Sequence, residues 1–300
     1  MKQIKAALLG RELSHSISDR LHSELFSILA PKYSADATGL NYELIELPMV
    51  TDIKEWIQAA RSKGYIGANI TYPYKDNAYE SAERHVGASG IIRSANTIKT
   101  SSAIIESAST DGQGFFNAVL RKFPEFHLDP YHLVVLGAGA AAKAVVYSLC
   151  TKWMPLSLTI VNRSNEQAQA LAEFCLAESP GPSVRIMSIN DFITSFPEQR
   201  RRMVIQATPL GQQNHPGNIA AGFQWNDSDL AADLVYHPLE TKFIQDATTA
   251  GAKTVSGLGM LIEQGALSQV FWFSGLSPER SPLNDEEFQR VYSTLSPFVQ

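Results

Sequence analysis

The sequence predicts an α/β protein with two domains, on three observations. The chain has 300 residues, which exceeds the roughly 100–200 residues of a typical single domain. Hydrophobic residues make up 44% of it, enough to build buried cores. Short β-rich runs alternate with longer stretches of helical period, which is typical of α/β proteins built on parallel sheets.

The first third of the chain predicts a βαβαβ unit. The expected strands are Ile4–Leu9, Tyr42–Leu47 and Tyr65–Ile70, and the expected helices between them are Asp19–Leu29 and Asp52–Ser62. Parallel strands need such helical crossovers. We therefore expect the three strands to lie in one sheet.

A second α/β series begins at Tyr131 and predicts a separate, doubly wound sheet. Its expected elements are the strand HLVVLG, a helix through Leu149, the strand SLTIVN, a helix Asn165–Leu176, and short strands near Val184–Ile186, Met203–Ile205 and Ala232–Val235. After Gly259 the pattern changes to a long apolar helix, MLIEQGALSQVFWF, and a closing helix near Asp285–Leu295. If these helices pack on the first domain, the domains are 1–111 plus 257–300, and 112–256.

Composition excludes several classes of protein. The chain has 25 Lys and Arg against 30 Asp and Glu, a net charge of −5, and no long basic run, so we expect neither a nucleic-acid nor a membrane partner. Cys150 and Cys175 lie in apolar helical stretches, which argues against a disulfide scaffold or a cysteine-rich metal site. His15, His22 and His237 are not grouped as metal ligands. With no signal-peptide pattern and no long apolar run, we expect a soluble cytoplasmic protein.

A glycine-rich turn follows the first strand of the second series. Residues 137–142, GAGAAA, stand between a buried strand and a helix, as a dinucleotide-binding G-x-G-x-x-[G/A] fingerprint requires. Gly137 permits the tight turn, Gly139 lets the backbone approach a pyrophosphate, and Ala142 allows close packing of helix on strand. An ordinary tight βα turn is the alternative, and the strand–turn–helix context favours cofactor binding over it.

The next strand ends in Asn162-Arg163-Ser164, about 25 residues after Gly137, where an NAD-specific site places a carboxylate. Here an arginine stands beside a small hydroxyl residue, and a guanidinium matches a 2′-phosphate in charge and geometry. NADP is therefore preferred over NAD. The alternative, a solvated Arg163, is disfavoured because a cation is poorly placed at a helix N-terminus.

Polar residues follow the strands of the first domain, where open α/β sheets bind ligands. Ser16 and Ser18 offer two hydroxyls after the first strand, although Ser18 also precedes a helix and suits an N-cap. Lys75 follows a strand that ends in a proline turn, and an exposed surface lysine is its alternative. Asn96 and Asp111 bring an amide and a carboxylate to the same region. A lysine oriented by an aspartate can exchange a proton with an alcohol or carbonyl oxygen during hydride transfer.

These residues resemble the shikimate dehydrogenase family over nearly the whole chain. The matching segments, in the family's order, are HSIS at Ser16 and Ser18, GANITYPYK ending at Lys75, SANT at Asn96, STDG at Asp111, GAGAA from Gly137, NRS from Asn162, and GLGMLIEQ ending at Gln264. DLVYHPLETKF, with Tyr236, is similar to a further family segment. Seven segments in order are highly specific.

The resemblance implies a residue-by-residue assignment. Lys75 would be the proton donor and acceptor, paired with Asp111. The implied substrate-binding residues are Ser16, Ser18, Thr71, Asn96, Asp111, Tyr236 and Gln264. The implied cofactor-binding residues are Gly137, Ala138, Gly139, Ala140, Ala141, Asn162, Arg163, Ser164, Thr208, Leu234 and Gly257.

The resemblance also implies a fold and an activity. The fold would be an N-terminal α/β substrate domain and a Rossmann-type doubly wound NADP-binding domain with a catalytic cleft between them. The activity would be the reversible NADPH-dependent reduction of 3-dehydroshikimate to shikimate, in the chorismate pathway of aromatic amino-acid biosynthesis. We expect no metal, a small-molecule substrate, and a monomer or homodimer.

Three residues depart from the family pattern, and three alternatives remain. Asp19 stands where the family has proline, Ser94 replaces a glycine, and Ser109 replaces an asparagine. Substrate preference is therefore open, and a paralogue acting on quinate or an amino analogue of shikimate is the first alternative. A non-catalytic ligand sensor is the second, disfavoured because Lys75 and Asp111 are both present. Methylenetetrahydrofolate dehydrogenase is the third, but its motifs do not match the serine loop or the N-R-S turn.

Overall fold

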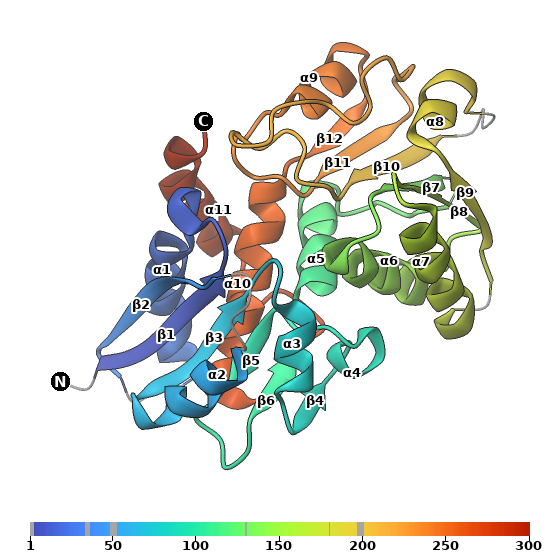
Figure 1. The fold of residues 1–300 in the computed structure, drawn as a ribbon. Helices are drawn as coiled ribbons and strands as arrows, with labels where there is room; N and C mark the ends of the chain where they lie inside the picture. The colour runs from blue at the N-terminus through green and yellow to red at the C-terminus, as the bar shows by residue number, and fades with distance from the viewer. Residues whose placement is uncertain (1–2, 34–36, 49–52, 130, 180, 197–200) are drawn as a thin grey trace. The chain divides into compact units, whose positions relative to one another are not determined.

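The computed structural model describes residues 3–33, 37–48, 53–129, 131–179, 181–196 and 201–300 (Figure 1). The chain forms two compact units. Unit 1 is Met1–Gly114 with Ile262–Phe298, and unit 2 is Phe115–Leu261 with Val299–Gln300. The chain changes unit inside two helices, α5 (Asp111–Lys122) and α10 (Gly257–Ser274). The domain boundaries drawn from the sequence stay predictions.

Unit 1 is built on a six-stranded sheet in the order β2-β1-β3-β5-β6-β4. Its strands are β1 (Gln3–Gly10), β2 (Gly39–Glu46), β3 (Tyr65–Ile70), β4 (Arg84–Val86), β5 (Thr97–Lys99) and β6 (Glu106–Ala108). Besides parts of α5 and α10, its helices are α1 (Ser18–Lys32), α2 (Ile53–Ser62), α3 (Lys75–Glu80), α4 (Ser89–Ile92) and α11 (Asp285–Leu295), with short 3-10 turns at Leu13–His15 and Ser296–Phe298.

The predicted βαβαβ unit is confirmed, since β1 pairs in parallel with both β2 and β3. Asp52, expected to begin the second helix, lies outside the described residues. The sheet also contains an antiparallel strand that the sequence analysis did not predict, since β5 runs antiparallel to β3 and β6. Only residues 100–105 join β5 to β6, and a parallel crossover needs a dozen or more residues.

Helices cover both faces of the sheet in unit 1. On one face, α2 and α3 contribute Ile53, Ile57 and Ala78 to a buried cluster. On the other, α10 packs Phe271 and Trp272 against the strands. α10 approaches closely because residue 67 is glycine: a Cβ there would lie 2.5 Å from the Trp272 ring. The sheet is thus buried on both sides, as the apolar strands require.

Unit 2 is a doubly wound parallel sheet in the order β12-β11-β10-β7-β8-β9, a Rossmann-type arrangement as predicted. Its strands are β7 (His132–Leu136), β8 (Ser157–Val161), β9 (Ser183–Met187), β10 (Arg202–Gln206), β11 (Leu230–Asp233) and β12 (Lys253–Val255). Its own helices are α6 (Ala140–Trp153), α7 (Asn165–Glu178), α8 (Ile189–Ser195) and α9 (Lys242–Thr249). α6 and α7 pack on one face and α8 and α9 on the other.

One predicted strand ends earlier than expected. The sequence predicts a strand at Ala232–Val235, but β11 ends at Asp233. The Asp233 carboxylate accepts a hydrogen bond from the Val235 backbone N–H at 2.9 Å. This side chain takes the donor that a longer strand would use for pairing, so the chain leaves the sheet before Tyr236.

Candidate active site

An ion pair between Lys75 and Asp111 stands at one edge of the unit 1 sheet. Lys75 Nζ lies 2.5 Å from Asp111 Oδ2. Each residue begins a helix, α3 and α5, directly after a loop. Their side chains are only 16% and 9% exposed. A mostly buried pair of this kind holds the ammonium in a defined position, as proton transfer requires.

Asn96 joins this ion pair to Gln264. Asn96 Nδ2 donates to Asp111 Oδ1 at 2.8 Å and to Gln264 Oε1 at 3.1 Å. Asn96 Oδ1 accepts from the Thr110 backbone N–H at 2.7 Å, which sets the orientation of the amide. The structure therefore brings four predicted site residues into one hydrogen-bonded cluster.

Strand pairing explains why these distant residues meet. β1 and β3 run in parallel, and Ile70 N–H donates to the Asn96 carbonyl at 2.8 Å. Because β5 is antiparallel to β6, its first residue, Thr97, pairs with Ala108, the last residue of β6. The loops after β1, β3 and β6 and the loop before β5 thus lie along the same edge.

The serine loop and Thr71 follow two neighbouring strands, β1 and β3, at that edge. The Ser16 and Ser18 hydroxyl oxygens are 3.0 Å apart, and Ser16 Oγ also accepts from Ser18 N–H at 3.2 Å. Ser18 is the first residue of α1 and Ile17 is its N-cap, so the N-cap alternative for Ser18 is wrong. Thr71 N–H donates to the Leu9 carbonyl at 2.9 Å, which connects the loops that follow β3 and β1.

In unit 2 the glycine-rich turn has the geometry of a phosphate-binding turn. Gly137 has φ +113°, which favours glycine, and a Cβ there would lie 3.0 Å from Thr208 Cγ2. Gly139 is the N-cap of α6 with no side-chain cap, and a Cβ on it would meet nothing within 4 Å. The first amides of α6 are therefore open to an anion such as a pyrophosphate.

The turn after β8 presents Arg163. Asn162 Nδ2 donates to the Ser164 carbonyl at 2.9 Å, and Ser164 Oγ accepts from Gln167 N–H as the N-cap of α7. Arg163 is exposed and makes no hydrogen bond or ion pair with the described part of the chain. Its guanidinium is therefore available to a phosphate, and the residues of this unit suit NADP.

Thr208, Leu234 and Gly257 complete this edge of the unit 2 sheet. Thr208 Oγ1 donates to Gln206 Oε1 at 2.7 Å, and Leu234 N–H donates to the Gln206 carbonyl at 2.9 Å. Gly257 begins α10, and a Cβ there would lie 2.5–2.6 Å from the carbonyl oxygens of residues 235 and 234. Tyr236 follows β11 and belongs to unit 2, whereas the other predicted substrate-binding residues belong to unit 1.

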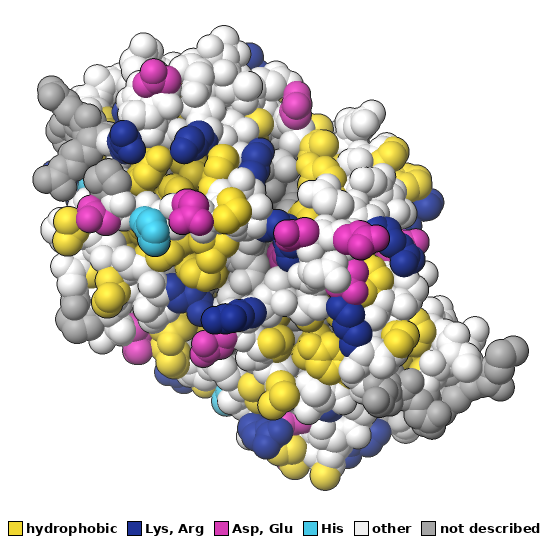
Figure 2. Space-filling view, turned by 180° about the vertical axis from the view of Figure 1, so that it is seen from behind, with side chains coloured by type: hydrophobic (Ala, Val, Ile, Leu, Met, Phe, Trp, Pro, Cys, Tyr) yellow, Lys and Arg dark blue, Asp and Glu magenta, His cyan; other side chains and the backbone are white. Residues whose placement is uncertain are grey.

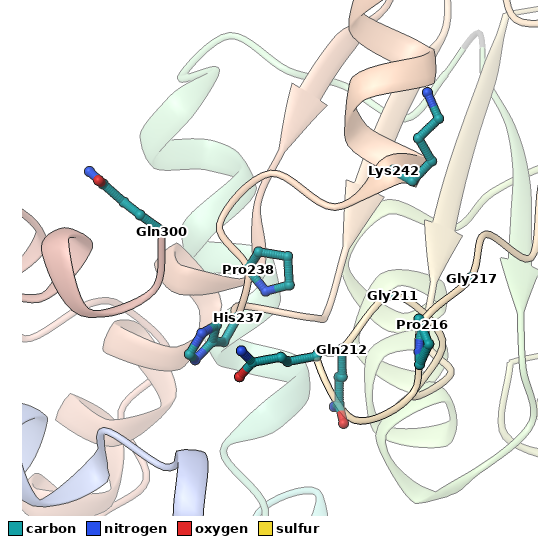
Figure 3. Close-up of a pocket in the computed structure, with 9 residues that line it drawn as sticks. Gly211, Gln212, Pro216, Gly217, His237, Pro238, Lys242 and Gln300 are labelled. Carbon is teal, nitrogen blue, oxygen red and sulfur yellow. The ribbon is translucent and has the colours of Figure 1, made fainter.

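A pocket of about 250 Å³ lies beside these loops in unit 2. It is lined by Gly211, Gln212, Gln213, Pro216, Gly217, His237, Pro238, Lys242 and Gln300. Figure 3 shows the side chains of Lys242 and Gln300 pointing away from His237. None of the predicted site residues lines it, so we do not place the candidate site there.

Sequence reasoning missed four polar residues that support the site. Thr110, Asn69 and Ser268 form a buried layer behind Asn96. Asp233 holds the segment before Tyr236, and burial raises its pKa to about 7 although hydrogen bonds from Thr241 and Val235 oppose the shift. Asp233, Asn69 and Thr110 lie in segments that resemble the family, DLVYHPLETKF, GANITYPYK and STDG, although none of the three was assigned a role. Ser268 had no such signal, because it resembles an ordinary serine inside an apolar helix.

Three further features concern metal ions, membranes and surface charge. Among the described residues, no group of three or more His, Cys, Asp or Glu side chains is placed to hold a metal ion, and no helix is long and apolar enough to cross a bilayer. On the face shown in Figure 2, Lys and Arg side chains are scattered among Asp and Glu and do not form one basic area.

The chain is similar in sequence and fold to known proteins over most of its length. Residues 8–98 match the shikimate dehydrogenase substrate binding domain. The shikimate dehydrogenase (NADP(+)) of Methanopyrus kandleri is 32% identical over 277 residues, 90% of each chain. A crystal structure of a shikimate dehydrogenase in complex with NADP+ is 26% identical, with a TM-score of 0.81 and coverage of 97% of this chain and 95% of that one. The Thermus thermophilus enzyme in complex with NADP(H) and shikimate is 26% identical, with a TM-score of 0.75 and coverage of 97% and 99%.

The fold and the two residue clusters define a two-domain, dinucleotide-binding α/β protein with a lysine–aspartate pair in the domain that does not carry the glycine-rich turn. Many proteins share such a plan, and fold alone does not identify one family. Sequence identity does: the chain belongs to the shikimate dehydrogenase family.

Proposed function

We propose that the protein is an NADP-dependent shikimate dehydrogenase, an oxidoreductase that interconverts 3-dehydroshikimate and shikimate in aromatic amino-acid biosynthesis. The Lys75–Asp111 pair, 2.5 Å apart and joined to Asn96, is the observation that carries this proposal. The names of the curated relatives and the solved complexes with NADP and shikimate support it.

In the proposed mechanism, Lys75 moves the proton. Bound NADPH would supply the hydride that reduces the ketone carbon. The Lys75 ammonium donates a proton to the oxygen that becomes the hydroxyl, and in the reverse direction the amine accepts it. Asp111 holds the ammonium in place through Oδ2, while Asn96 holds Asp111 through Oδ1.

The remaining residues bind the two ligands. Ser16, Ser18, Thr71, Asn96, Asp111, Gln264 and Tyr236 would contact the hydroxyls and the carboxylate of shikimate. Gly137–Ala141 and the α6 N-terminus would bind the pyrophosphate, and Arg163 with Asn162 and Ser164 the 2′-phosphate. Thr208, Leu234 and Gly257 would line the rest of the cofactor site. No metal is needed for this chemistry.

Replacement of the lysine tests the proposal. Lys75→Met keeps the length of the side chain but removes the proton donor, so we expect kcat for shikimate oxidation by NADP+ to fall ~10²–10⁴-fold. Lys63→Met is the control, because Lys63 is an exposed lysine of the same unit outside the cluster. Near-normal turnover by Lys75→Met would contradict the proposed mechanism.

The same assay separates the proposed activity from its nearest alternative. Asp19, Ser94 and Ser109 depart from the family pattern. Ser94 and Ser109 are both buried, and they stand two positions before Asn96 and Asp111. We expect kcat/KM to be highest for shikimate with NADP+. A higher kcat/KM for quinate, or for NAD+, would assign the protein to a quinate-type paralogue instead.

We further propose a cytoplasmic protein that works as a monomer or homodimer on small molecules, without nucleic-acid or membrane partners. The low cysteine content supports the first part of this proposal, because two cysteines in 300 residues are unlike a disulfide-rich secreted protein.

A further inference from the structure

We propose that Ser268 is a positioning residue that orients Asn96, and through it Asp111, for the acid–base step at Lys75. This inference rests on the proposed function and adds to it a residue for which the resemblance implies no role. Ser268 lies on α10, one turn after Gln264, and is completely buried. It touches none of the proposed ligand-binding positions except the backbone carbonyl of Gln264.

Ser268 is the meeting point of three chain segments. Its hydroxyl oxygen lies 2.9 Å from Asn69 Nδ2 on β3, 3.2 Å from Thr110 Oγ1 after β6, and 2.9 Å from the Gln264 carbonyl on its own helix. Asn69 and Thr110 are 6% and 1% exposed. Because these side chains are buried, water does not readily replace a lost hydrogen-bond partner. Loss of one hydrogen bond therefore affects the other hydrogen bonds of the network.

Donor and acceptor chemistry permits one arrangement of these protons. Thr110 Oγ1 has two polar side-chain neighbours, Asn96 Nδ2 at 2.8 Å and Ser268 Oγ. The Asn96 NH2 group only donates, and the Ser268 hydroxyl donates to the Gln264 carbonyl, so the Thr110 hydroxyl is the donor to Ser268. Ser268 then donates its single proton to the Gln264 carbonyl and accepts from both Thr110 and Asn69.

The far end of the network is also set. Tyr42 Oη donates to Asn69 Oδ1 at 2.9 Å, and burial raises the Tyr42 pKa well above its usual value, so this hydroxyl keeps its proton. Asn69 therefore turns its NH2 group toward Ser268. A directed series of hydrogen bonds leads from Tyr42 to Ser268, and a second bond to Ser268 comes from Thr110, next to Asn96.

The consequence falls on Asn96, whose two N–H protons face three acceptors. These are Thr110 Oγ1, Asp111 Oδ1 and Gln264 Oε1. While Thr110 donates to Ser268, its lone pairs face Asn96 and share in holding the NH2 group. Without Ser268 Oγ, the Thr110 hydroxyl has lost its acceptor and turns, and the Asn96–Asp111 contact loosens. Asp111 then holds the Lys75 ammonium less well.

Ser268→Ala removes this oxygen without replacing any residue that is proposed to bind a ligand. We expect kcat for shikimate oxidation by NADP+ to fall about 10-fold, as when a buried donor loses its acceptor. KM for shikimate should change less than kcat, because Ser16, Ser18 and Thr71 are untouched and, of the residues that bind substrate, only those joined to Asn96 are disturbed. The matched control is Ser274→Ala, which removes a hydroxyl that donates to the Val270 carbonyl in the same helix but lies outside the network. Its kcat should equal that of the wild type.

Thr110→Val tests the same link from the other side. It should lower kcat to a similar extent, and the Ser268→Ala/Thr110→Val double variant should be no worse than either single variant, because both changes break one linkage. Independent, multiplying losses in the double variant would overturn the proposal, as would a Ser268→Ala kcat within twofold of the wild type. If Ser268→Ala fails to fold, Ser268→Cys, which keeps the size of the side chain but replaces the hydroxyl oxygen by a weakly accepting sulfur, takes its place in the same comparisons.

A spectroscopic measurement separates this proposal from the proposed function. The side-chain amide NMR signals of Asn96 can be assigned by their loss in Asn96→Ala. They should shift in Ser268→Ala and keep their positions in Ser274→Ala. If the wild-type protein does not turn over shikimate but the Asn96 signals do shift in Ser268→Ala, the proposed function is overturned and the positioning role is supported. Wild-type turnover with unshifted Asn96 signals in Ser268→Ala would overturn the positioning role alone.

Discussion

At the scale of single residues, Arg163 is expected to decide cofactor preference. It is exposed, follows β8 and has no hydrogen-bonding or ionic partner in the described part of the chain. Arg163→Gln should raise KM for NADP+ on the order of 10- to 100-fold, since it removes a charge-assisted bond to the 2′-phosphate, and leave KM for NAD+ nearly unchanged. Steady-state kinetics with both cofactors checks this.

Arg185→Gln is the matched control for that experiment. Arg185 is also exposed and lies on β9, which pairs with β8, but it stands mid-strand rather than at the turn. The same loss of charge there should leave KM for NADP+ within about twofold. An equal rise in both variants would show a general electrostatic effect and would contradict a specific site at Arg163.

The residues of the candidate site differ in how far sequence could predict them. Lys75 and Asp111 stand in motifs that directly follow strands, so their meeting at one sheet edge could be predicted. Ser268 could not, because a serine inside an apolar helix has no pattern that separates a hydrogen-bonding hub from an ordinary back-bonded hydroxyl such as Ser274. Its role depends on which strands lie beneath the helix.

At the scale of elements, the packing of α10 on the unit 1 sheet depends on Gly67. A Cβ there would lie 2.5 Å from the Ile98 carbonyl oxygen and from Trp272, whose Nε1 donates to that same carbonyl. Gly67→Ala must therefore displace backbone or α10, and should lower the free energy of unfolding by about 1–3 kcal/mol or more. Urea denaturation followed by circular dichroism measures it.

Gly39 provides the matched control within the same sheet. It begins β2, and a Cβ there would meet nothing nearer than Gln3 atoms at 3.7 Å, an ordinary contact. Gly39→Ala should change the free energy of unfolding by less than about 1 kcal/mol, because the added methyl group meets only an ordinary contact and lowers the entropy of the unfolded chain. Equal losses in the two variants would contradict the close approach of α10 to Gly67.

Element prediction succeeded for most long and periodic segments, although it missed the 12-residue helix α5, and it failed for several short ones. The βαβαβ unit and the helix Asp285–Leu295 could be predicted because each buries a regular face. β5 and β6 have three residues each, too few to show a period, so the antiparallel strand went undetected. The early end of β11 depends on one side-chain hydrogen bond at Asp233, which no periodicity contains.

At the scale of the whole molecule, the two units are expected to respond to pH in opposite directions. In unit 1, burial lowers the pKa of His22 to about 3, despite an opposing hydrogen bond with Asn69. The unfolded chain therefore binds the extra proton first as pH falls below about 6.5. Above that pH the His22 ionisation does not lower the free energy of unfolding, and at pH 5 it lowers the free energy of unfolding by about 2 kcal/mol.

Asp233 acts in the other direction in unit 2. Burial raises its pKa from 3.8 to about 7, so the folded state keeps a proton that the unfolded chain releases. The contribution of Asp233 to the free energy of unfolding is greatest below its unfolded-state pKa of 3.8, and it is lost as pH rises through about 7. The loss between pH 5 and pH 8 amounts to up to about 3 kcal/mol. The two groups nearly cancel over that range in the intact chain.

Two variants separate these opposed contributions. His22→Gln removes the increase in the free energy of unfolding that His22 gives between pH 5 and pH 8. The opposing effect of Asp233 then remains, so this variant should be less stable at pH 8 than at pH 5. Asp233→Asn removes the loss, so that variant should become more stable at pH 8 than at pH 5. Urea midpoints of the ligand-free protein at both pH values measure the change. Because the predicted shifts have opposite signs, a general effect of mutation cannot produce both, and variants that keep the wild-type pH response would contradict the assignment of these two buried groups.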